Sequence, residues 1–323
     1  MTELSAICRP VSPELSRTSK LVVSALARAA RLSGCPADAV PATAGKMIRP
    51  ALLLMVARLF GADKDTAVRL AAAVELVHAA SLIHDDVIDA SGMRRGAPTA
   101  FRSIGAADAV LLGDVVFANA FADVASLGSD VITREIAATV RDVCAGEVRQ
   151  NRAKGTFDSG RAWYLRTAEL KTASLYRACA VLPALAAGAA RPRVAAAGRF
   201  GRNFGLAFQI TDDLLDVIGD PRRTGKPNGR DLAQGKTTLP LVIFFETLGS
   251  AERRRVRRAL REGQAPVRRE VLAALGRPAV VTAVRRAAER CRARATADLD
   301  RLPDAPEKAH LASLCLFAVN RLY

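Results

Sequence analysis

Two clusters of aspartates share one spacing and are the residues in this chain best suited to chemistry. Segments 85–89 and 212–216 both read DDxxD, and each follows a long apolar stretch with helical spacing. Positions i, i+1 and i+4 of a helix share roughly one face, so each cluster would project its carboxylates in one direction. Acids gathered on apolar helices repel one another strongly unless cations lie among them. Oxygen sites that leave room for water and phosphates suit Mg²⁺, so the pattern predicts diphosphate binding through magnesium.

Basic residues flank both clusters. Arg94 and Arg95 follow the first one, and the guanidinium fork binds phosphate oxygens well. The second cluster is followed by a Gly- and Pro-rich stretch, 219–238, which contains Lys226 and Lys236. A long loop of this kind often carries function, and here it would form a flap over phosphate. The alternatives are that both arginines only pair with the aspartates and that Lys226 is a solvated loop residue.

Two further basic pieces fit a phosphate site. Lys46 and Arg49 lie three residues apart at the expected start of a helix, where backbone N–H groups also favour anions. A Lys-Thr pair that begins at Lys171 interrupts a helix rich in Ala and Leu. A buried lysine needs a partner, and a diphosphate is one candidate. The alternative is a salt bridge to a helix acid such as Glu169 or Glu147.

The composition favours an all-α fold. Half of the 323 residues are hydrophobic, and Ala and Leu recur throughout while Tyr and Trp are few. Pro10 and Pro13 predict a flexible arm over residues 1–17, followed by a single all-helical domain over 18–323. Helical patterns are expected over 19–33, 50–61, 65–89, 105–127, 131–152, 162–188 and 193–218, with four or five more helices after residue 238.

The net charge of +16 comes largely from arginines late in the chain, at 253–258, 268–269 and 285–286. Solvated helix faces explain them most simply. No zinc-finger spacing, aromatic-basic interleaving or recognition helix accompanies them, so no nucleic-acid partner is expected. Attraction for anionic lipid headgroups or for diphosphate substrates is a milder alternative.

The six cysteines form no CxxC pair, which argues against a zinc site or a disulfide framework and fits a cytoplasmic protein. The first nine residues lack the apolar core of a signal peptide, and the uncharged run 178–190 is short for a bilayer span. We therefore expect a cytoplasmic protein, with room for peripheral membrane contact during product release.

The motifs together resemble the trans-isoprenyl diphosphate synthases of the polyprenyl synthetase family, of the medium- and long-chain type. The resemblance spans roughly 40–245 and rests on ordered motifs. They are GKMIRP at 45–50, His78, DDVID at 85–89, RRGAPT at 94–99, the Lys-Thr pair, FQITDD at 208–213, and the loop from GKP at 225–227 to GKTTLP at 235–240. The resemblance implies a bundle of long helices around a central cavity, of the isoprenoid synthase type.

The resemblance also implies a role for each matching residue. Isopentenyl diphosphate would be held by Lys46, Arg49, His78 and Arg95. The allylic diphosphate would be held by Arg94, Lys171, Thr172, Gln209, Lys226 and Lys236. Mg²⁺ ions, about three per active site, would bind to Asp85, Asp89, Asp212 and Asp216. The catalytic set would be Asp85, Asp89, Arg94, Lys171, Asp212 and Lys226. Ala44 and Met47 stand where the family usually has a glycine and a basic residue, and we expect only a modest change from this.

The implied reaction is ionisation of the allylic diphosphate, condensation with isopentenyl diphosphate, and elimination of a proton. Magnesium and basic residues would stabilise the departing diphosphate, and a dry apolar cavity would protect the allylic cation from water. This chemistry needs no nucleophilic side chain, in agreement with the absence of a convincing Ser-His-Asp or Cys-His pattern.

The residues upstream of the first aspartates bear on product length. Ala80 and Ser81, with Val77 a turn further, would line the tunnel for the growing chain. In the family, aromatic side chains at the first pair stop elongation early. Small side chains here predict an all-trans product longer than C20. Phe117 or Phe121 could instead close the tunnel lower down, which leaves a short-chain farnesyl or geranylgeranyl synthase as the alternative.

Other functions are weaker alternatives. A class I terpene cyclase also uses an acidic metal cluster, but its second site normally has an Asn/Ser/Glu pattern. Non-catalytic partner subunits of prenyl synthases tend to lose aspartates or basic residues, whereas this chain keeps them. The resemblance favours a homodimer, and a catalytic subunit of a heteromeric synthase is the alternative.

Overall fold

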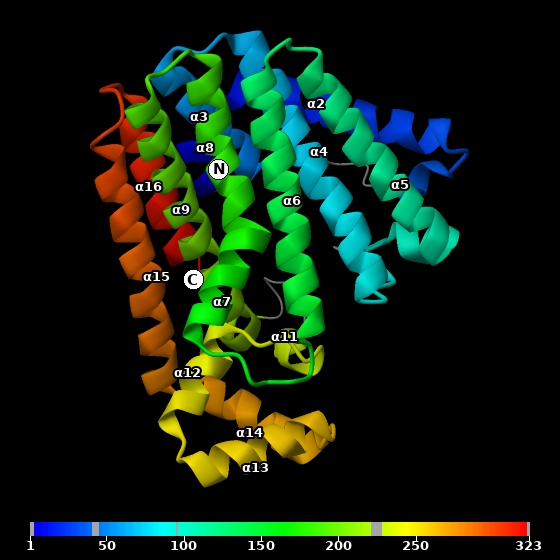
Figure 1. Ribbon diagram of the computed structural model, residues 1–323, viewed down its shortest axis with the longest axis vertical. Coiled ribbons are helices and arrows are strands. Elements are labelled where there is room, and N and C mark those ends of the chain that lie inside the picture. The colour runs from blue at the N-terminus through cyan, green and yellow to red at the C-terminus, as the bar shows by residue number, and fades with distance from the viewer. Residues whose placement is uncertain (1–2, 41–44, 95, 221–227, 322–323) are drawn as a thin grey trace. The chain divides into compact units, whose positions relative to one another are not determined.

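The computed structural model describes residues 3–40, 45–94, 96–220 and 228–321, and most of them are helical (Figure 1). The strands in these ranges are the two-residue β1 (Met93–Arg94) and β2 (Ala97–Pro98). They pair antiparallel, with Met93 opposite Pro98. The predicted all-α fold is confirmed.

The helices up to residue 152 are α1 (Glu3–Ile7), η1 (Arg9–Val11), α2 (Ser12–Leu32), η2 (Ala37–Ala39), α3 (Ile48–Phe60), α4 (Lys64–Ile88), α5 (Ala100–Ala125) and α6 (Asp130–Arg152). The later ones are α7 (Arg161–Ala168), η3 (Glu169–Ala173), α8 (Ser174–Ala186), α9 (Arg191–Ile218), α11 (Arg230–Ala233), α12 (Leu239–Thr247), α13 (Ser250–Arg261), α14 (Ala265–Leu275), α15 (Pro278–Leu299) and α16 (Glu307–Asn320). The long helices fall where the apolar spacing predicts them.

The first residues differ from the prediction. A flexible arm is expected over 1–17, but residues 3–17 belong to α1, η1 and the start of α2. The two prolines that suggest an arm occupy the first turns of η1 and α2, where the missing N–H removes no helical hydrogen bond. Ile7 and Val11 are buried, so apolar contact holds this segment in place.

The chain forms two compact units. The first unit contains Met1–Arg141, Leu175–Gly201 and Ala297–Leu314, and the second contains Asp142–Ser174, Arg202–Thr296 and Cys315–Tyr323. The boundaries fall inside α6, α8, α9, α15 and α16, so a linker does not separate the units. A single domain over 18–323 stays a prediction.

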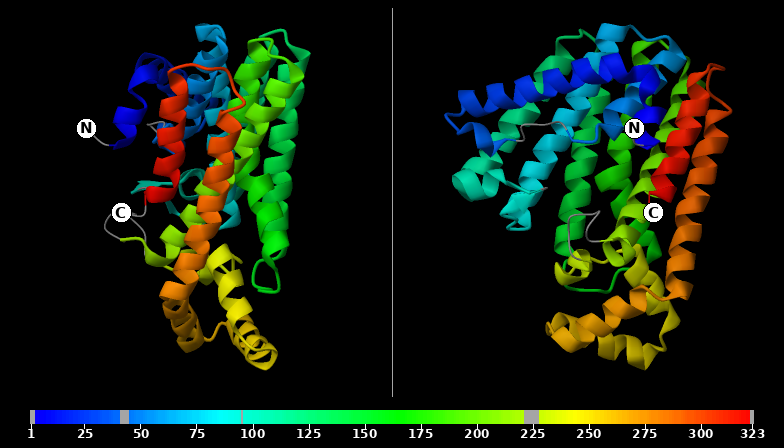
Figure 2. Two further views of the ribbon diagram at one scale, coloured as in Figure 1. Left: turned by 90° about the vertical axis from the view of Figure 1, so that its left-hand side faces the viewer. Right: turned by 180° about the vertical axis from the view of Figure 1, so that it is seen from behind.

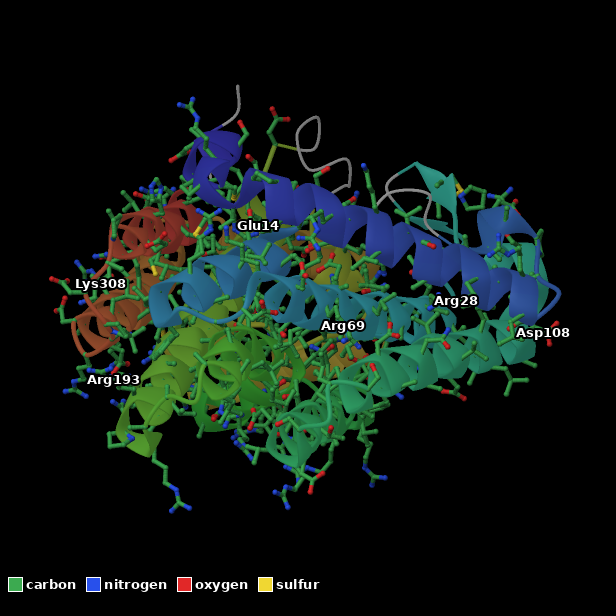
Figure 3. All side chains as sticks on the ribbon, turned by 90° about the horizontal axis from the view of Figure 1, so that it is seen from above. Glu14, Arg28, Arg69, Asp108, Arg193 and Lys308 are labelled. Carbon is green, nitrogen blue, oxygen red and sulfur yellow. The ribbon has the colours of Figure 1, made fainter. Side chains whose placement is uncertain are left out.

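The first unit is built around α4. This helix contacts α2, α3 and α5, and α2 crosses α4 and α5 (Figure 2). Asp63 caps the start of α4, since its carboxylate accepts a hydrogen bond from the Thr66 N–H at 2.8 Å. Glu14 of α2 and Arg69 of α4, both labelled in Figure 3, each bind a residue of a neighbouring helix. Glu14 pairs with Arg58 of α3 at 2.7 Å, and Arg69 donates to the Asp123 carbonyl of α5 at 3.0 Å.

Two helices of the first unit, α4 and α5, are long and apolar enough to cross a membrane by length and composition. The apolar stretch of α4 is 67% buried, as expected for the core helix of the unit, while that of α5 is only 33% buried. Leu111 of α5 is 62% exposed, and Val110 beside it is also exposed. α5 therefore presents apolar side chains that the first unit does not cover.

The second unit has its own core around the short helix α12, whose residues from Leu239 to Phe245 are all buried. α7 and α14 contact α12, and α13 lies beside α14 (Figure 1). One arginine of the arginine-rich segment contacts other parts of the chain. The guanidinium carbon of Arg257 lies 4.9 Å from the centroid of the Phe245 ring, and Arg257 pairs with Asp158. The six cysteines all lie in the described ranges, and none of them forms a disulfide there.

Candidate functional site

The first aspartate cluster lies at the C-terminal end of α4. Asp85 and Asp89 are half-buried and one turn apart, and the Asp89 N–H closes the last turn on the Asp85 carbonyl at 2.9 Å. The C-terminal end of a helix carries negative partial charge, so two carboxylates placed there raise the demand for cations further. This pair has the position and donor type that a hard dication needs.

The middle aspartate of this cluster is already occupied. The buried Asp86 carboxylate accepts three hydrogen bonds from Arg94, two from Nε at 3.1 and 2.9 Å and one from Nη2 at 2.8 Å. The β1–β2 hairpin presents Arg94 for this contact. In the structure Arg94 therefore pairs with an aspartate, which was the alternative to phosphate binding. Arg95 lies outside the described residues.

The close approach of α4 and α5 fixes the helix end that carries the aspartates. His84 Nε2 lies 3.0 Å from the Val110 carbonyl and 3.4 Å from Asp114, and its ring centroid is 5.5 Å from that of Phe117. Gly113 of α5 has no side chain, and a Cβ there would overlap the His84 ring. Phe117 therefore packs beside His84, and His84 is the residue directly before Asp85 in the chain.

The residues predicted to set product length lie on the same helix. Val77 and Ala80 are fully buried. Ser81 is half-buried, and its hydroxyl donates to the His78 carbonyl at 2.8 Å. Small side chains thus stand one and two turns before the aspartates, as the sequence indicates.

The residues predicted for isopentenyl diphosphate also belong to the first unit. α3 begins at Ile48 after Met47, whose φ of 54° is left-handed, and Lys46 stands exposed before this turn. Arg49 lies in the first turn, with its guanidinium 4.8 Å from the centroid of the Tyr176 ring. The Arg49 Nε is buried without a hydrogen-bond partner among the described atoms. A buried donor of this kind is costly unless a ligand uses it.

The Lys-Thr pair of the second unit lies in a π-helical segment. Residues Glu169–Ala173 widen the helix between α7 and α8, a feature frequent at functional sites. The Lys171 ammonium pairs with Glu147 of α6 and donates to the Gln150 side-chain carbonyl at 3.0 Å. Of the two acids considered as partners, Glu147 is the one used. Glu169 instead binds Arg202 at 2.7 Å.

A chain of hydrogen bonds connects this segment to the second aspartate cluster. The Thr172 hydroxyl donates to Gln209 at 2.7 Å, and the Gln209 amide donates to Asp213 at 2.7 Å. The Leu239 N–H reaches the other Asp213 oxygen at 3.5 Å. Burial, with the nearby charge of Asp231, raises the pKa of Asp213 to about 7. The network orients both Thr172 and Gln209.

The loop after α9 returns to the same helix end. The Gly229 N–H donates to the Asp216 carbonyl at 2.7 Å, and the Asp231 N–H donates to the Asp216 carboxylate at 3.1 Å. Burial and the charge of Asp231 raise the pKa of Asp216 to about 6, and burial also raises the pKa of Asp231. Gly235, at φ 74°, accepts from the Gly155 N–H at 2.8 Å, and a Cβ on Gly235 would crowd Gly155. These contacts place the segment before Lys236.

A cavity of about 120 Å³ joins these elements within the second unit. It brings together four residues that the sequence predicts for the allylic diphosphate, namely Lys171, Thr172, Gln209 and Lys236. Lys226, the other lysine of the loop, lies outside the described residues. Sequence reasoning placed Asp213 only as a member of the second aspartate cluster, and it assigned no role to further lining residues, among them Gln150, Tyr164 and Asp231. Asp231 lies within the loop motif between residues 225 and 240, so the sequence could have indicated a role for it. No motif contains Gln150 or Tyr164.

The metal-binding prediction rests on donor chemistry. Within the described ranges, no three His, Cys, Asp or Glu side chains gather closely enough to hold a metal ion by themselves. Mg²⁺ usually binds through one or two carboxylates and keeps waters and substrate phosphates as its other ligands. Asp85 with Asp89, and Asp212 with Asp216, are pairs of this kind at i and i+4. The residues present therefore fit magnesium that is completed by a diphosphate.

An all-helical chain with two DDxxD helix ends, each accompanied by basic residues, defines a prenyltransferase of the isoprenoid synthase class. The polyprenyl synthetase family model matches residues 32–276. The chain belongs to that family.

Named relatives agree with this class. The chain is 36% identical to an octaprenyl diphosphate synthase of Escherichia coli over 278 residues, 86% of each chain. It is 43% identical to component 2 of the heptaprenyl diphosphate synthase of Geobacillus stearothermophilus, over 198 residues that span 61% of this chain and 62% of that one. A polyprenyl synthase structure from Caulobacter crescentus, complexed with calcium and isoprenyl diphosphate, superposes with a TM-score of 0.89 at 32% identity and covers 99% of this chain and 98% of that chain.

Close backbone packing of α6 on the π-helical segment gives a first prediction. A Cβ on Gly146 would overlap the backbone of Lys171 and Leu170. Gly146→Ala should lower the free energy of unfolding by about 1–3 kcal/mol, because the π-helical segment cannot move aside without breaking its contacts. Urea unfolding measures this. Gly249→Ala, where a Cβ meets nothing within 4 Å, is the matched control. Equal stability of the two variants would contradict the packing described.

Buried carboxyls of the second unit predict a pH dependence of the metal-free protein. The pKa of Asp213 in the folded state, about 7, lies above its ordinary value of 3.8, so the folded state binds more protons between these values. Stability in a chelator should therefore fall as pH rises from about 4 to 7 and level off above. Asp213→Asn should raise the melting temperature relative to the wild type more at pH 8 than at pH 5. The exposed Asp108→Asn should show no such difference.

Proposed function

We propose that this chain is a Mg²⁺-dependent prenyltransferase that condenses isopentenyl diphosphate with an allylic diphosphate into an all-trans polyprenyl diphosphate. The observation that carries the proposal is the cavity of the second unit, where Lys171 and Lys236 lie with Thr172 and Gln209 beside the second DDxxD motif. Two lysines and two neutral donors next to acidic metal ligands suit a diphosphate, which needs both kinds of partner.

The allylic diphosphate is the substrate proposed for this cavity. Glu147 and Gln150 fix the direction of the Lys171 ammonium. Thr172 and Gln209 are already oriented through Asp213, so binding costs them little conformational entropy. Lys226 is proposed as a further ligand on the basis of its loop motif alone.

Four aspartates are proposed as magnesium ligands: Asp85 and Asp89 on α4, and Asp212 and Asp216 on α9. When bound, the ions supply positive charge that stabilises the diphosphate leaving group. Asp86 is not included because Arg94 occupies its carboxylate. We assign Asp86 to hold Arg94, which keeps the guanidinium of Arg94 at a fixed position for a phosphate oxygen.

Isopentenyl diphosphate is proposed to bind at the start of α3. Lys46 and Arg49 supply charge there, together with the positive end of the helix dipole. The buried Nε of Arg49 is a donor for which a phosphate oxygen is a suitable acceptor. His78 of α4 and Arg95 complete the proposed set.

The proposed reaction breaks the C–O bond of the allylic diphosphate, and the bonding electrons leave with the diphosphate. The isopentenyl double bond then attacks the allylic cation and forms the new C–C bond. A proton is lost from the resulting cation to the released diphosphate, so no side chain needs to act as base. Basic residues of the chain stabilise the leaving group, which places the charge stabilisation where charge develops.

A homodimer is the proposed assembly, and the uncovered face of α5 with Val110 and Leu111 is the proposed contact. A heteromer is the alternative, since one relative is named as a component of its synthase. The proposed location is the cytoplasm, with peripheral membrane contact as the long product leaves.

The test is product formation from isopentenyl diphosphate, farnesyl diphosphate and Mg²⁺, with the products separated by chain length. Lys171→Gln should lower kcat/KM by about 100-fold or more, because a charge aimed at the leaving group is lost. Lys308→Gln removes a lysine of α16 that is paired with Asp304, and this variant should leave activity unchanged. A wild-type chain without activity on any allylic primer, in the presence of Mg²⁺, would refute the proposed homodimeric synthase and turn attention to the heteromeric alternative.

Product length gives a further prediction. We propose products longer than C20, because Ala80, Ser81 and Val77 are small at the positions before Asp85. Ala80→Phe should shorten the product by filling the tunnel. Ser81→Phe, at a half-buried position, tests the same idea if Ala80→Phe does not fold. Ala279→Phe, at an exposed position of α15, is the control. Unchanged product length in folded Ala80→Phe and Ser81→Phe variants would contradict the tunnel assignment.

A further inference from the structure

Asp212, one of the proposed metal ligands, already has a cationic partner in the chain. Arg321 follows α16, and its Nη2 lies 2.7 Å from Asp212 Oδ1. The Asp212 side chain is 44% exposed and that of Arg321 only 15%. Both residues belong to the second unit. The arginine thus covers one oxygen of a carboxylate that remains otherwise open.

Arg321 is held by more than this ion pair. Its Nη2 also donates to the Phe208 carbonyl at 2.7 Å, and its Nε donates to the Ala318 carbonyl at 3.1 Å. The guanidinium carbon lies 3.6 Å from the centroid of the Phe208 ring. Phe208 and Asp212 are one turn apart on α9, so a single flat group can lie on the ring and reach the carboxylate. The geometry is specific for an arginine.

We propose that Arg321 is the resident counter-ion of Asp212 in the metal-free protein, and that a metal ion binding at Asp212 displaces it and releases the last turn of α16. The proposal rests on the proposed function, in which Asp212 is a metal ligand. Two cations that approach one carboxylate repel each other at short range, so the guanidinium and the metal ion compete for the same carboxylate.

The surroundings of the last turn allow this movement. A cavity of about 410 Å³ lies among α9, α15 and α16, lined in part by Ile210 and Leu214 of α9. Val319 and Asn320, the two residues before Arg321, line it as well. The turn is therefore incompletely packed on this side, while Ala318 is buried and Val319 packs against the core of the second unit. The Arg321 contacts add to this attachment, so their loss should loosen the turn.

Metal binding tests the proposal without any turnover. Mn²⁺ with inorganic pyrophosphate is titrated into the protein, and bound Mn²⁺ is counted by electron paramagnetic resonance. Arg321→Gln should tighten the Mn²⁺ site that depends on Asp212 by about three- to tenfold, because the competing cation is gone. Arg321→Lys keeps the charge but loses the flat fork, and it should fall between wild type and Arg321→Gln. Arg301→Gln, which loses only a contact to Asp298 at 3.7 Å, should bind like the wild type.

Hydrogen exchange of the wild-type protein provides a second readout that needs no variant. Amides of residues 315–320 should exchange faster when Mn²⁺ and pyrophosphate are added, whereas other amides of the site should be protected. This measurement still decides the matter if Arg321→Gln fails to fold.

The outcomes separate the two proposals. Asp212→Asn should bind one Mn²⁺ fewer per chain, and an unchanged number would refute the metal role of Asp212 and the displacement with it. If Asp212→Asn loses an ion while Arg321→Gln binds Mn²⁺ like the wild type and residues 315–320 exchange no faster, the displacement is overturned and the proposed function stands.

Discussion

Concentrated negative charge in partly dry surroundings is the constraint on which this structure depends. Both aspartate clusters terminate apolar helices, and an ionised carboxylate there costs free energy unless a cation or a proton neutralises it. The chain supplies these partners itself. Arg94 binds Asp86, Arg321 binds Asp212, and backbone N–H groups approach Asp216. Asp213 is neutralised in another way, since burial raises its pKa to about 7.

This internal neutralisation bears on how substrates and metal ions enter. The positive charge of Lys171 is likewise neutralised within the chain, because Lys171 pairs with Glu147. The proposed substrate, a diphosphate accompanied by magnesium, would bring charges of both signs and could exchange with these pairs. The folded protein therefore holds these charged groups in fixed positions before any ligand binds. Such preorganisation is what charge-stabilising catalysis requires.

Much of the fold could be predicted from the sequence. Helical spacing located the long helices, because an apolar stripe that must be buried leaves a clear period. The same signal failed at residues 3–17, where two prolines suggested an arm although proline is well tolerated in a first helical turn. Local motifs indicated Lys171, Thr172, Gln209 and Lys236, which line one cavity. Glu147 was one of two acids considered as a partner of Lys171, and the structure contains that pair. Gln150, which binds Lys171, and Arg321, which binds Asp212, could not be predicted, because they come from distant segments and no motif marks them. The π-helical segment was also missed, because a one-residue widening leaves no periodic trace.

The contact between Gly155 and Gly235 has a consequence for engineering of this enzyme class. The two backbones touch where neither residue has a side chain, and the N–H of one bonds to the carbonyl of the other. The end of the lysine-bearing loop is thereby anchored to the segment after α6 by backbone alone. A chimera that combines this loop from one synthase with the α6 segment of another therefore needs a glycine at both positions, 155 and 235. Transplanted loops also have to keep the contacts of Gly229 and Asp231 with Asp216, which help to place the segment before Lys236.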